Sequence, residues 1–130
     1  MTGVTGARSG VKAHQDSVRL ADDVLVRDLR DLLGAKLVAY IGSVKETRAV
    51  RQWADGERKP SADVMHRLRT AYHVAALLAE RDSRAVVQAW FQGMNPQLDD
   101  VPPARLIRDG QVDDAGPQVL AAARAFAAAA

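Results

Sequence analysis

The sequence predicts an all-α protein, on three observations. Apolar residues recur at three- and four-residue spacing through most of the chain, which is typical of amphipathic helices. Only 5% of the residues are aromatic although 48% are hydrophobic, so Ala, Val and Leu must build most of the core. No run of alternating residues makes a convincing strand. About seven helices account for the chain, whose 130 residues suit one compact domain or two very small ones sharing a core.

The first part of the chain contains a predicted tail and two predicted helices. Residues 1–16 are rich in Gly, Ser and Thr and lack the apolar core of a secretory signal, so a flexible start to a cytoplasmic protein is expected. Between residues 17 and 34, leucines and valines fall on one stripe, which predicts a long amphipathic helix that Gly34 ends. A shorter helix is expected over AKLVAYIGS, residues 35–43.

The third predicted helix, within ETRAVRQWADGERKP, points most clearly to a function. Ser43 and Glu46 predict a capping box before it, because a serine followed three residues later by a glutamate satisfies the first helical N–H groups. Val50 and Trp53 mark its inner side, and Gly56 ends it. On a helix, residues three and four apart stand side by side, so its outer side presents long polar side chains together. The outward residues are Thr47, Arg48, Arg51 and Gln52.

Four more helices are expected in the rest of the chain. Serine or aspartate precedes the first two of them as a cap, and a glycine closes the second and the third. Two adjacent prolines in the connector MNPQLDDVPP argue against regular structure there. A proline near the first turn is also expected in the terminal helix. The residues expected at these boundaries are Ser61, Asp82 or Ser83, Gly93, Ala104, Gly110 and Pro117.

Charge is unevenly distributed along the chain. Residues 1–81 hold 14 Lys and Arg against 10 Asp and Glu, a net charge of +4, whereas residues 82–130 hold 4 against 6, a net charge of −2. A basic first part and a mildly acidic second part suggest separate partners. Cysteine is absent, which excludes disulfides, thiolate metal sites and a cysteine nucleophile, and no apolar stretch approaches the roughly 18 residues of a membrane span.

Catalysis is not expected from these residues. The three histidines, His14, His66 and His73, form no convincing metal pair with a carboxylate, and the adjacent aspartate pairs are typical of caps and turns. No Gly-rich phosphate loop, nucleophile elbow or zinc spacing is present in the sequence. We therefore predict no catalytic residue, no cofactor and no metal ligand.

The order of elements around the third helix is that of a helix-turn-helix unit, in which the second helix lies in the major groove of double-stranded DNA. Arg48 can donate two hydrogen bonds to guanine, and Gln52 can pair with adenine, with Thr47 and Arg51 beside them. Spacing alone leaves open that these arginines form an ordinary solvated face. The residues placed to meet phosphates are Lys45, Arg58 and Lys59.

The run AVRQWADGERKP resembles the recognition helix of the Xre, or lambda-repressor-like, helix-turn-helix family. In that family a buried aliphatic residue, two polar positions and a large apolar residue precede two further residues and a glycine. The residues filling these places are Val50, Arg51, Gln52, Trp53 and Gly56. The resemblance implies that Thr47, Arg48 and Gln52 read bases. The loop GSVKE before the helix is longer than the family's usual turn.

The segment AWFQGMNPQLDDVPPARLIRDG, followed by VLAAARAF, resembles the C-terminal toxin-binding domain of Xre/MbcA/ParS-type antitoxins. That domain has an Asn-Pro-x-Leu turn and a Pro-x-x-Leu-Leu-x-x-Gly helix. The matching residues are Asn95, Pro96 and Leu98, then Pro103, Leu106, Ile107 and Gly110. Antitoxins of this family dimerise, repress their own promoter and block a RES-domain toxin, an enzyme that degrades NAD. The resemblance thus implies a homodimer with a toxin partner, and the terminal segment with Phe126 as a toxin contact.

Other features of this segment follow from the residues themselves. An asparagine before a proline is restricted to extended or turn conformations, so Asn95 and Pro96 predict a sharp redirection between helices. Trp90 is expected in the core, while Phe91 is left open between core and interface. The tail LAAARAFAAAA packs or frays as a terminal helix, enters the toxin, or resembles the Ala-Ala ends that bacterial proteases accept.

The predicted organisation is a flexible tail over residues 1–16, a lambda-repressor-like DNA-binding domain over residues 17–81 and a small helical toxin-binding and dimerisation domain over residues 82–130. The expected function is a DNA-binding antitoxin that represses its own operon and neutralises a RES-domain toxin. Two alternatives stay open: a transcriptional regulator of the same build without a toxin, and a protein-interaction adaptor that does not bind DNA.

Overall fold

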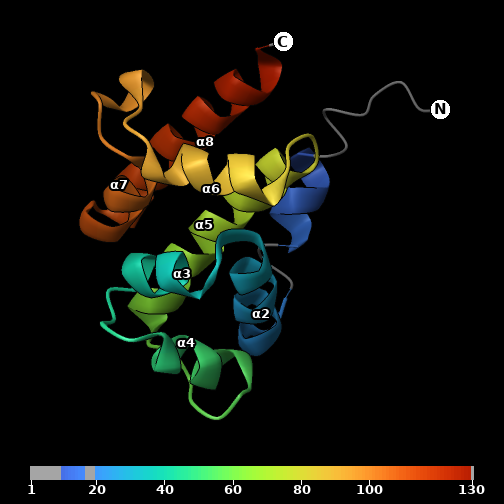
Figure 1. Cartoon of the computed structure of the whole chain (residues 1–130), viewed down its shortest axis with the longest axis vertical. Coiled ribbons are helices and arrows are strands. Elements are labelled where there is room, and N and C mark those ends of the chain that lie inside the picture. Colours follow the sequence, from blue (N-terminus) through green and yellow to red (C-terminus); the bar gives the residue numbers. More distant parts are fainter. Residues whose placement is uncertain (1–9, 17–19, 130) are drawn as a thin grey trace, which may run out of the picture.

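The computed structural model describes residues 10–16 and 20–129, and throughout these ranges the regular structure is helical, which confirms the predicted all-α class (Figure 1). The elements after residue 20 are α2 (Asp22–Leu33), α3 (Ala35–Ile41), α4 (Thr47–Ala54), α5 (Ala62–Ala79), α6 (Arg84–Gln92), the 3-10 helix η1 (Pro96–Leu98), α7 (Pro103–Asp109) and α8 (Val112–Ala128). None of the described helices combines the length and the apolar character that a membrane crossing requires.

One buried cluster joins the two halves of the chain. It includes Leu25 and Leu29 of α2 and extends to Ala122 and Ala123 of α8. The long helix α5 packs against α2 and against α8, and Figure 1 shows it crossing the middle of the molecule. The two segments that the sequence separates at residue 82 therefore share one core.

Side-chain hydrogen bonds reinforce the contact between the halves. Arg84 of α6 donates to the carbonyl of Asp31 at 3.0 Å, and Gln88 donates to the carbonyl of Leu32 at 3.1 Å. Both carbonyls lie in the last turn of α2, where a helix leaves its carbonyls without intrahelical partners. Helix α6 thus donates hydrogen bonds to two of the last four carbonyls of α2.

The start of the chain differs from the prediction. Residues 10–16, assigned above to a flexible tail, form a helix in which Ala13 is only 2% exposed; residues 1–9 of that predicted tail lie outside the described residues. Helix α2 begins at Asp22 and not at residue 17. Arg69 donates to the carbonyl of Leu20 at 3.1 Å and to the Asp22 carboxylate at 2.6 Å, and these two bonds hold a bend where the helix was expected.

The predicted capping box before α4 is wrong. Ser43 has a φ of 60°, the left-handed conformation that ends helices, and its N–H bonds to the carbonyl of Tyr40 at 3.1 Å. The N–H of Val44 bonds to the carbonyl of Ala39 at 3.0 Å. Ser43 therefore belongs to the end of α3, while Glu46 is the N-cap residue of α4 and makes no side-chain hydrogen bond to the helix.

Two serine caps are confirmed. The hydroxyl of Ser61 accepts a hydrogen bond from the N–H of Val64 at 3.2 Å, and the hydroxyl of Ser83 accepts one from the N–H of Val86 at 3.2 Å. Of the two residues considered for the start of α6, the cap is thus Ser83 and not Asp82. Such caps satisfy first-turn donors and contribute about 1 kcal/mol each.

The proline-containing segments are more regular than predicted. Pro96 opens the 3-10 helix η1 within the connector, and α7 begins at Pro103, one residue before the expected start. Helix α8 begins at Val112, so Pro117 lies inside the helix and not near its first turn. Aspartates in the first turn of α8 explain the earlier start, because negative charge stabilises the positive end of a helix.

Candidate nucleic-acid interface

Helix α4 has one face buried and the other in solvent. On the inner face Val50 is fully buried and Trp53 is 3% exposed, and α4 packs against α2 and α3. Figure 1 shows α4 near one end of the long axis, with the C-terminal end of α8 near the other. The outer face of α4 is therefore presented at an extremity of the molecule.

The C-terminal end of α4 is held by a neighbouring helix and by a tight reversal. Arg27 of α2 donates from Nη2 to the carbonyl of Ala54 at 3.2 Å. Gly56 then adopts a φ of 76°, which a glycine reaches without the steric cost of a Cβ. The N–H of Arg58 bonds back to the carbonyl of Gln52 at 3.3 Å. The chain thus returns along α4 and brings Arg58 beside it.

The turn before α4 is held from α5. Arg67 donates from Nε to the carbonyl of Ile41 at 3.0 Å and from Nη2 to the carbonyl of Gly42 at 3.2 Å. A Cβ on Gly42 would lie 3.3 Å from the Trp53 ring, so the absence of a side chain lets the indole pack against the end of α3. The hydrogen bonds of Arg67 and the packing of Trp53 on Gly42 therefore fix the direction in which the chain runs from α3 toward α4.

Four of the predicted DNA-contacting residues meet on the outer face. They line one open hollow of about 520 Å³: Lys45, Arg48, Gln52 and Arg58, with Val44, Glu46 and Ala49. The three cations are exposed, and none of them forms an ion pair with another residue that the structure describes. Against the single carboxylate of the hollow they leave a net charge of +2.

Three predicted residues lie outside this hollow. Thr47 and Lys59 are exposed but do not line it. Arg51 is held by carboxylates, since its Nη1 lies 3.2 Å from Oδ2 of Asp55 and 3.2 Å from Oε2 of Glu57. Its charge is thus opposed in the free protein. The sequence carried a signal for this, because an acidic residue four positions after an arginine on a helix forms an ion pair.

The first turn of α4 also favours an anion. No side chain caps this end, because the N-cap residue Glu46 makes no side-chain hydrogen bond to the helix. The positive end of the helix dipole lies here, and although the N–H of Ala49 bonds to the carbonyl of Glu46 at 3.3 Å, the first N–H groups of a helix generally lack an intrahelical acceptor. Helix N-termini of this kind bind phosphate oxygens.

The residues that match the antitoxin-type motif are mostly structural. The Asn95 side chain accepts a hydrogen bond from the N–H of Gln97 at 2.9 Å, and its carbonyl accepts from the N–H groups of Leu98 at 2.9 Å and Asp100 at 2.9 Å. The predicted turn at Asn95 and Pro96 is thus confirmed. The buried members of the motif are Leu98, Pro103 and Ile107, while Leu106 is half-buried.

Of the two aromatic residues of α6, Phe91, whose place was left open, is the one that enters the core. Phe91 is fully buried, whereas Trp90, expected in the core, is only half-buried. Successive residues of a helix point about 100° apart, so a single register decides which of the two enters the core. The Trp90 ring lies 5.4 Å from that of Phe91 and 6.4 Å from that of Phe126, between centroids. Phe126 itself is 41% exposed.

Comparison of the chain with protein-family models, with curated proteins and with solved structures found no match. The resemblance to Xre/MbcA/ParS-type antitoxins is therefore carried by the motifs quoted above. The function proposed below depends on those motifs and on the geometry of the α4 face.

Proposed function

We propose that this protein binds double-stranded DNA in a sequence-specific manner, with α3 and α4 as a helix-turn-helix unit and α4 as the recognition helix. The observation that carries the proposal is the convergence on one solvent-facing hollow of Gln52 and three cations that form no ion pair with a described residue. The helix beneath that hollow is anchored by its buried face and by Arg27 and Arg67 from neighbouring helices. A rigid helix with such a face can enter a major groove as a unit.

The residues of the hollow divide into two roles in this proposal. Arg48 and Gln52, one helical turn apart, contact base edges, where arginine pairs with guanine and glutamine with adenine. Lys45 and Arg58, at the two ends of α4, meet phosphates and hold the register. Arg51 joins them when DNA displaces its two carboxylates, which is feasible because exposed ion pairs are worth only about 0–1 kcal/mol.

Fluorescence anisotropy on DNA from upstream of the gene, and on a scrambled copy, tests the proposal across a salt series. We expect tighter binding to the native sequence and a steep loss of affinity as salt rises. Arg48→Ala with Gln52→Ala removes two base contacts and should weaken native-sequence binding at least about 25-fold. Equal weak binding to both DNAs, or an unaffected double variant, would exclude α4 as the recognition helix.

A matched control is available on α7 and α8, at residues that do not line the hollow on α4. Arg105→Ala with Gln118→Ala deletes the same two side-chain types from exposed positions of α7 and α8. This control should leave DNA affinity within about twofold, because surface substitutions away from an interface change energies by about 0.5 kcal/mol or less.

One helix-turn-helix offers a small contact area, so two copies on half-sites about 10 base pairs apart are also part of the proposal.

Capture of a partner protein is a second candidate function of the C-terminal segment. The observation that favours it is that large apolar side chains are exposed there. Met94, just after α6, is 76% exposed, and Phe126 of α8 is 41% exposed beside Trp90 of α6. By the motif resemblance we propose a RES-domain toxin as this partner and autorepression as the role of DNA binding. Co-purification with a RES-domain protein encoded beside the gene, lost on Met94→Ser with Phe126→Ser, is the expected result. Unchanged co-purification would exclude this surface.

A further inference from the structure

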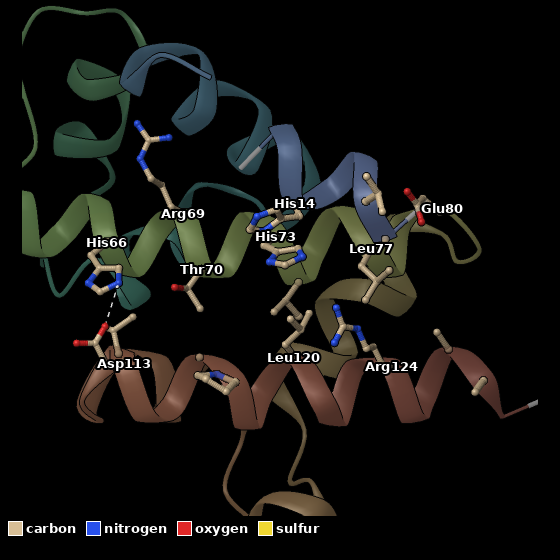
Figure 2. A pocket seen from close by; sticks show the side chains of 18 of the residues that line it. His14, His66, Arg69, Thr70, His73, Leu77, Glu80, Asp113, Leu120 and Arg124 are labelled. Carbon is tan, nitrogen blue, oxygen red and sulfur yellow. Dashed lines mark ion pairs between the residues drawn. The ribbon is translucent and has the colours of Figure 1, made fainter. Parts of the chain in front are cut away.

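A second and larger hollow lies on a different part of the molecule. It is a groove of about 1360 Å³ between α5 and α8, bordered by the helix of residues 10–16, and it shares no lining residue with the hollow on α4 (Figure 2). Its apolar lining includes Val11, Val74, Leu77, Pro117 and Leu120. A concave, largely apolar site with a few polar groups is the usual form of a small-molecule site.

The two ends of the groove differ. At one end His66 of α5 and Asp113 of α8 form an ion pair of 3.6 Å, drawn as the dashed line in Figure 2. The helices approach closely nearby, since a Cβ on Gly116 would lie 3.4 Å from Cγ2 of Thr70. From residue 66 to residue 80 the groove extends about 21 Å along α5, at 1.5 Å per residue. It is thus long, but narrow at the end where α5 and α8 meet.

Cationic and hydrogen-bonding groups converge on the middle of the groove. The rings of His14 and His73 lie 5.2 Å apart between centroids, and Figure 2 shows Arg124 reaching toward the groove from α8. Burial lowers the pKa of His73, and the neighbouring His14 and Arg124 lower it further. Nε2 of His73 is buried without a hydrogen-bond partner among the described residues.

The carboxylates of the groove lie toward its ends. Asp113 is paired with His66, and Glu80 lines the opposite end together with Arg81. Arg124 forms no ion pair with any residue in the described part of the chain. Among the described residues, the middle of the groove therefore supplies no negative charge to balance Arg124.

We propose that the groove binds a small amphiphilic carboxylate, whose apolar chain lies along Val74, Leu77 and Leu120 and whose carboxylate meets Arg124. A carboxylate accepts charge-assisted hydrogen bonds from a guanidinium. A partner helix fits less well, because a helix is about 10 Å wide and the contact of Gly116 with Thr70 narrows one end of the groove.

Methyl NMR of the whole chain, titrated with octanoate and with octanol, tests this site in the absence of DNA. Octanol has the same apolar chain without the charge, so both ligands should shift the methyl resonances of Val74, Leu77 and Leu120. Octanoate should bind about tenfold more tightly, which is the effect of a hydrogen bond to a charged group. Because no DNA is present, the result is independent of the function proposed for α4.

Two variants and one control separate the head group from the chain. Arg124→Gln should remove the tenfold preference for octanoate, whereas Arg105→Gln, an exposed arginine outside the groove, should keep it. Ala127→Glu places a carboxylate in the lining and should weaken octanoate about tenfold while leaving octanol unchanged. Arg124 and Ala127 are not deeply buried, so both variants should keep the circular dichroism melting curve of the parent.

Three results would overturn the proposal. The first is no saturable shift of the groove methyls with octanoate. The second is equal affinity for octanoate and octanol, unaffected by Arg124→Gln. The third is that the same resonances do not respond to free octanoate but shift in another experiment. A shift with protein concentration alone would assign the groove to a second copy of the chain. A shift with phosphatidylglycerol vesicles would assign it to a lipid surface.

Discussion

Neutralising the two carboxylates that hold Arg51 is expected to strengthen DNA binding. In the free protein Nη1 of Arg51 lies 3.2 Å from both Asp55 and Glu57. Asp55→Asn with Glu57→Gln releases the guanidinium and removes two negative charges beside the face that would meet phosphates. The shapes of the side chains are nearly unchanged, so the backbone reversal after α4 should persist.

The magnitude follows from the exposure of the pair. Two unit charges 3.2 Å apart interact by about 1.3 kcal/mol in water, and measured exposed pairs reach only about 0–1 kcal/mol. The three side chains are 49%, 45% and 54% exposed, which places both pairs in this weak class. A net gain of about 1 kcal/mol, or about fivefold in affinity, is therefore expected. If Arg51 then contacts one more phosphate, the slope of log affinity against log salt steepens by about 0.9.

Anisotropy at several salt concentrations measures both quantities. Asp99→Asn with Asp100→Asn is the matched control, because it changes the net charge by the same amount in the connector before α7. Those residues have φ values of 55° and 64°, a conformation that asparagine tolerates. An equal gain in this control would mean that only net charge matters. No gain in either pair would mean that Arg51 lies away from the DNA.

Chemical denaturation tests the packing beneath the α4 face and the groove. Trp53→Ala should lower the free energy of unfolding by about 3–5 kcal/mol, and Trp90→Ala, at a half-buried position, by less; equal losses would contradict the assigned burial. Arg67→Ala removes two hydrogen bonds to the end of α3 and should lower it by about 1–3 kcal/mol, so an unchanged urea midpoint would show that this anchor is dispensable. Burial lowers the pKa of His73 below 6.5, so under that pH the unfolded chain binds a proton that the folded chain excludes. The free energy of unfolding should therefore fall as pH drops below about 6.5, and His73→Gln should remove part of that decline; an identical pH profile would refute it.

Local rules predicted some helix ends and missed one that looks the same in the sequence. Ser61 and Ser83 cap their helices through bonds that span three residues, so the pattern contains all that is needed. Ser43 and Glu46 have the same spacing, yet Ser43 takes a left-handed conformation. There Arg67, 25 residues away from Gly42, holds the carbonyl at the end of α3, and a local pattern carries no information about that contact.

The candidate DNA-binding face was likewise predictable only where it depends on residues close together in the sequence. Arg48 and Gln52 share a side of α4 because the helical period places them one turn apart. The position of Arg58 beside α4 depends on the reversal at Gly56, and so does the contact of Arg51 with Glu57, whereas its contact with Asp55 follows from the helical spacing. The groove between α5 and α8 had no signal in the sequence, since its residues come from three separate helices.

The sequence by itself determined the helical class, most helix positions and the polar outer side of α4, because helical periodicity, serine caps and glycine ends act within a few residues. Only the tertiary structure decided that the two halves share one core, that Phe91 and not Trp90 is fully buried, and that a second hollow exists. Those features depend on contacts such as that of Arg84 with Asp31, 53 residues apart. Such contacts are selected by the packing of whole helix faces against one another, which no short stretch of sequence specifies.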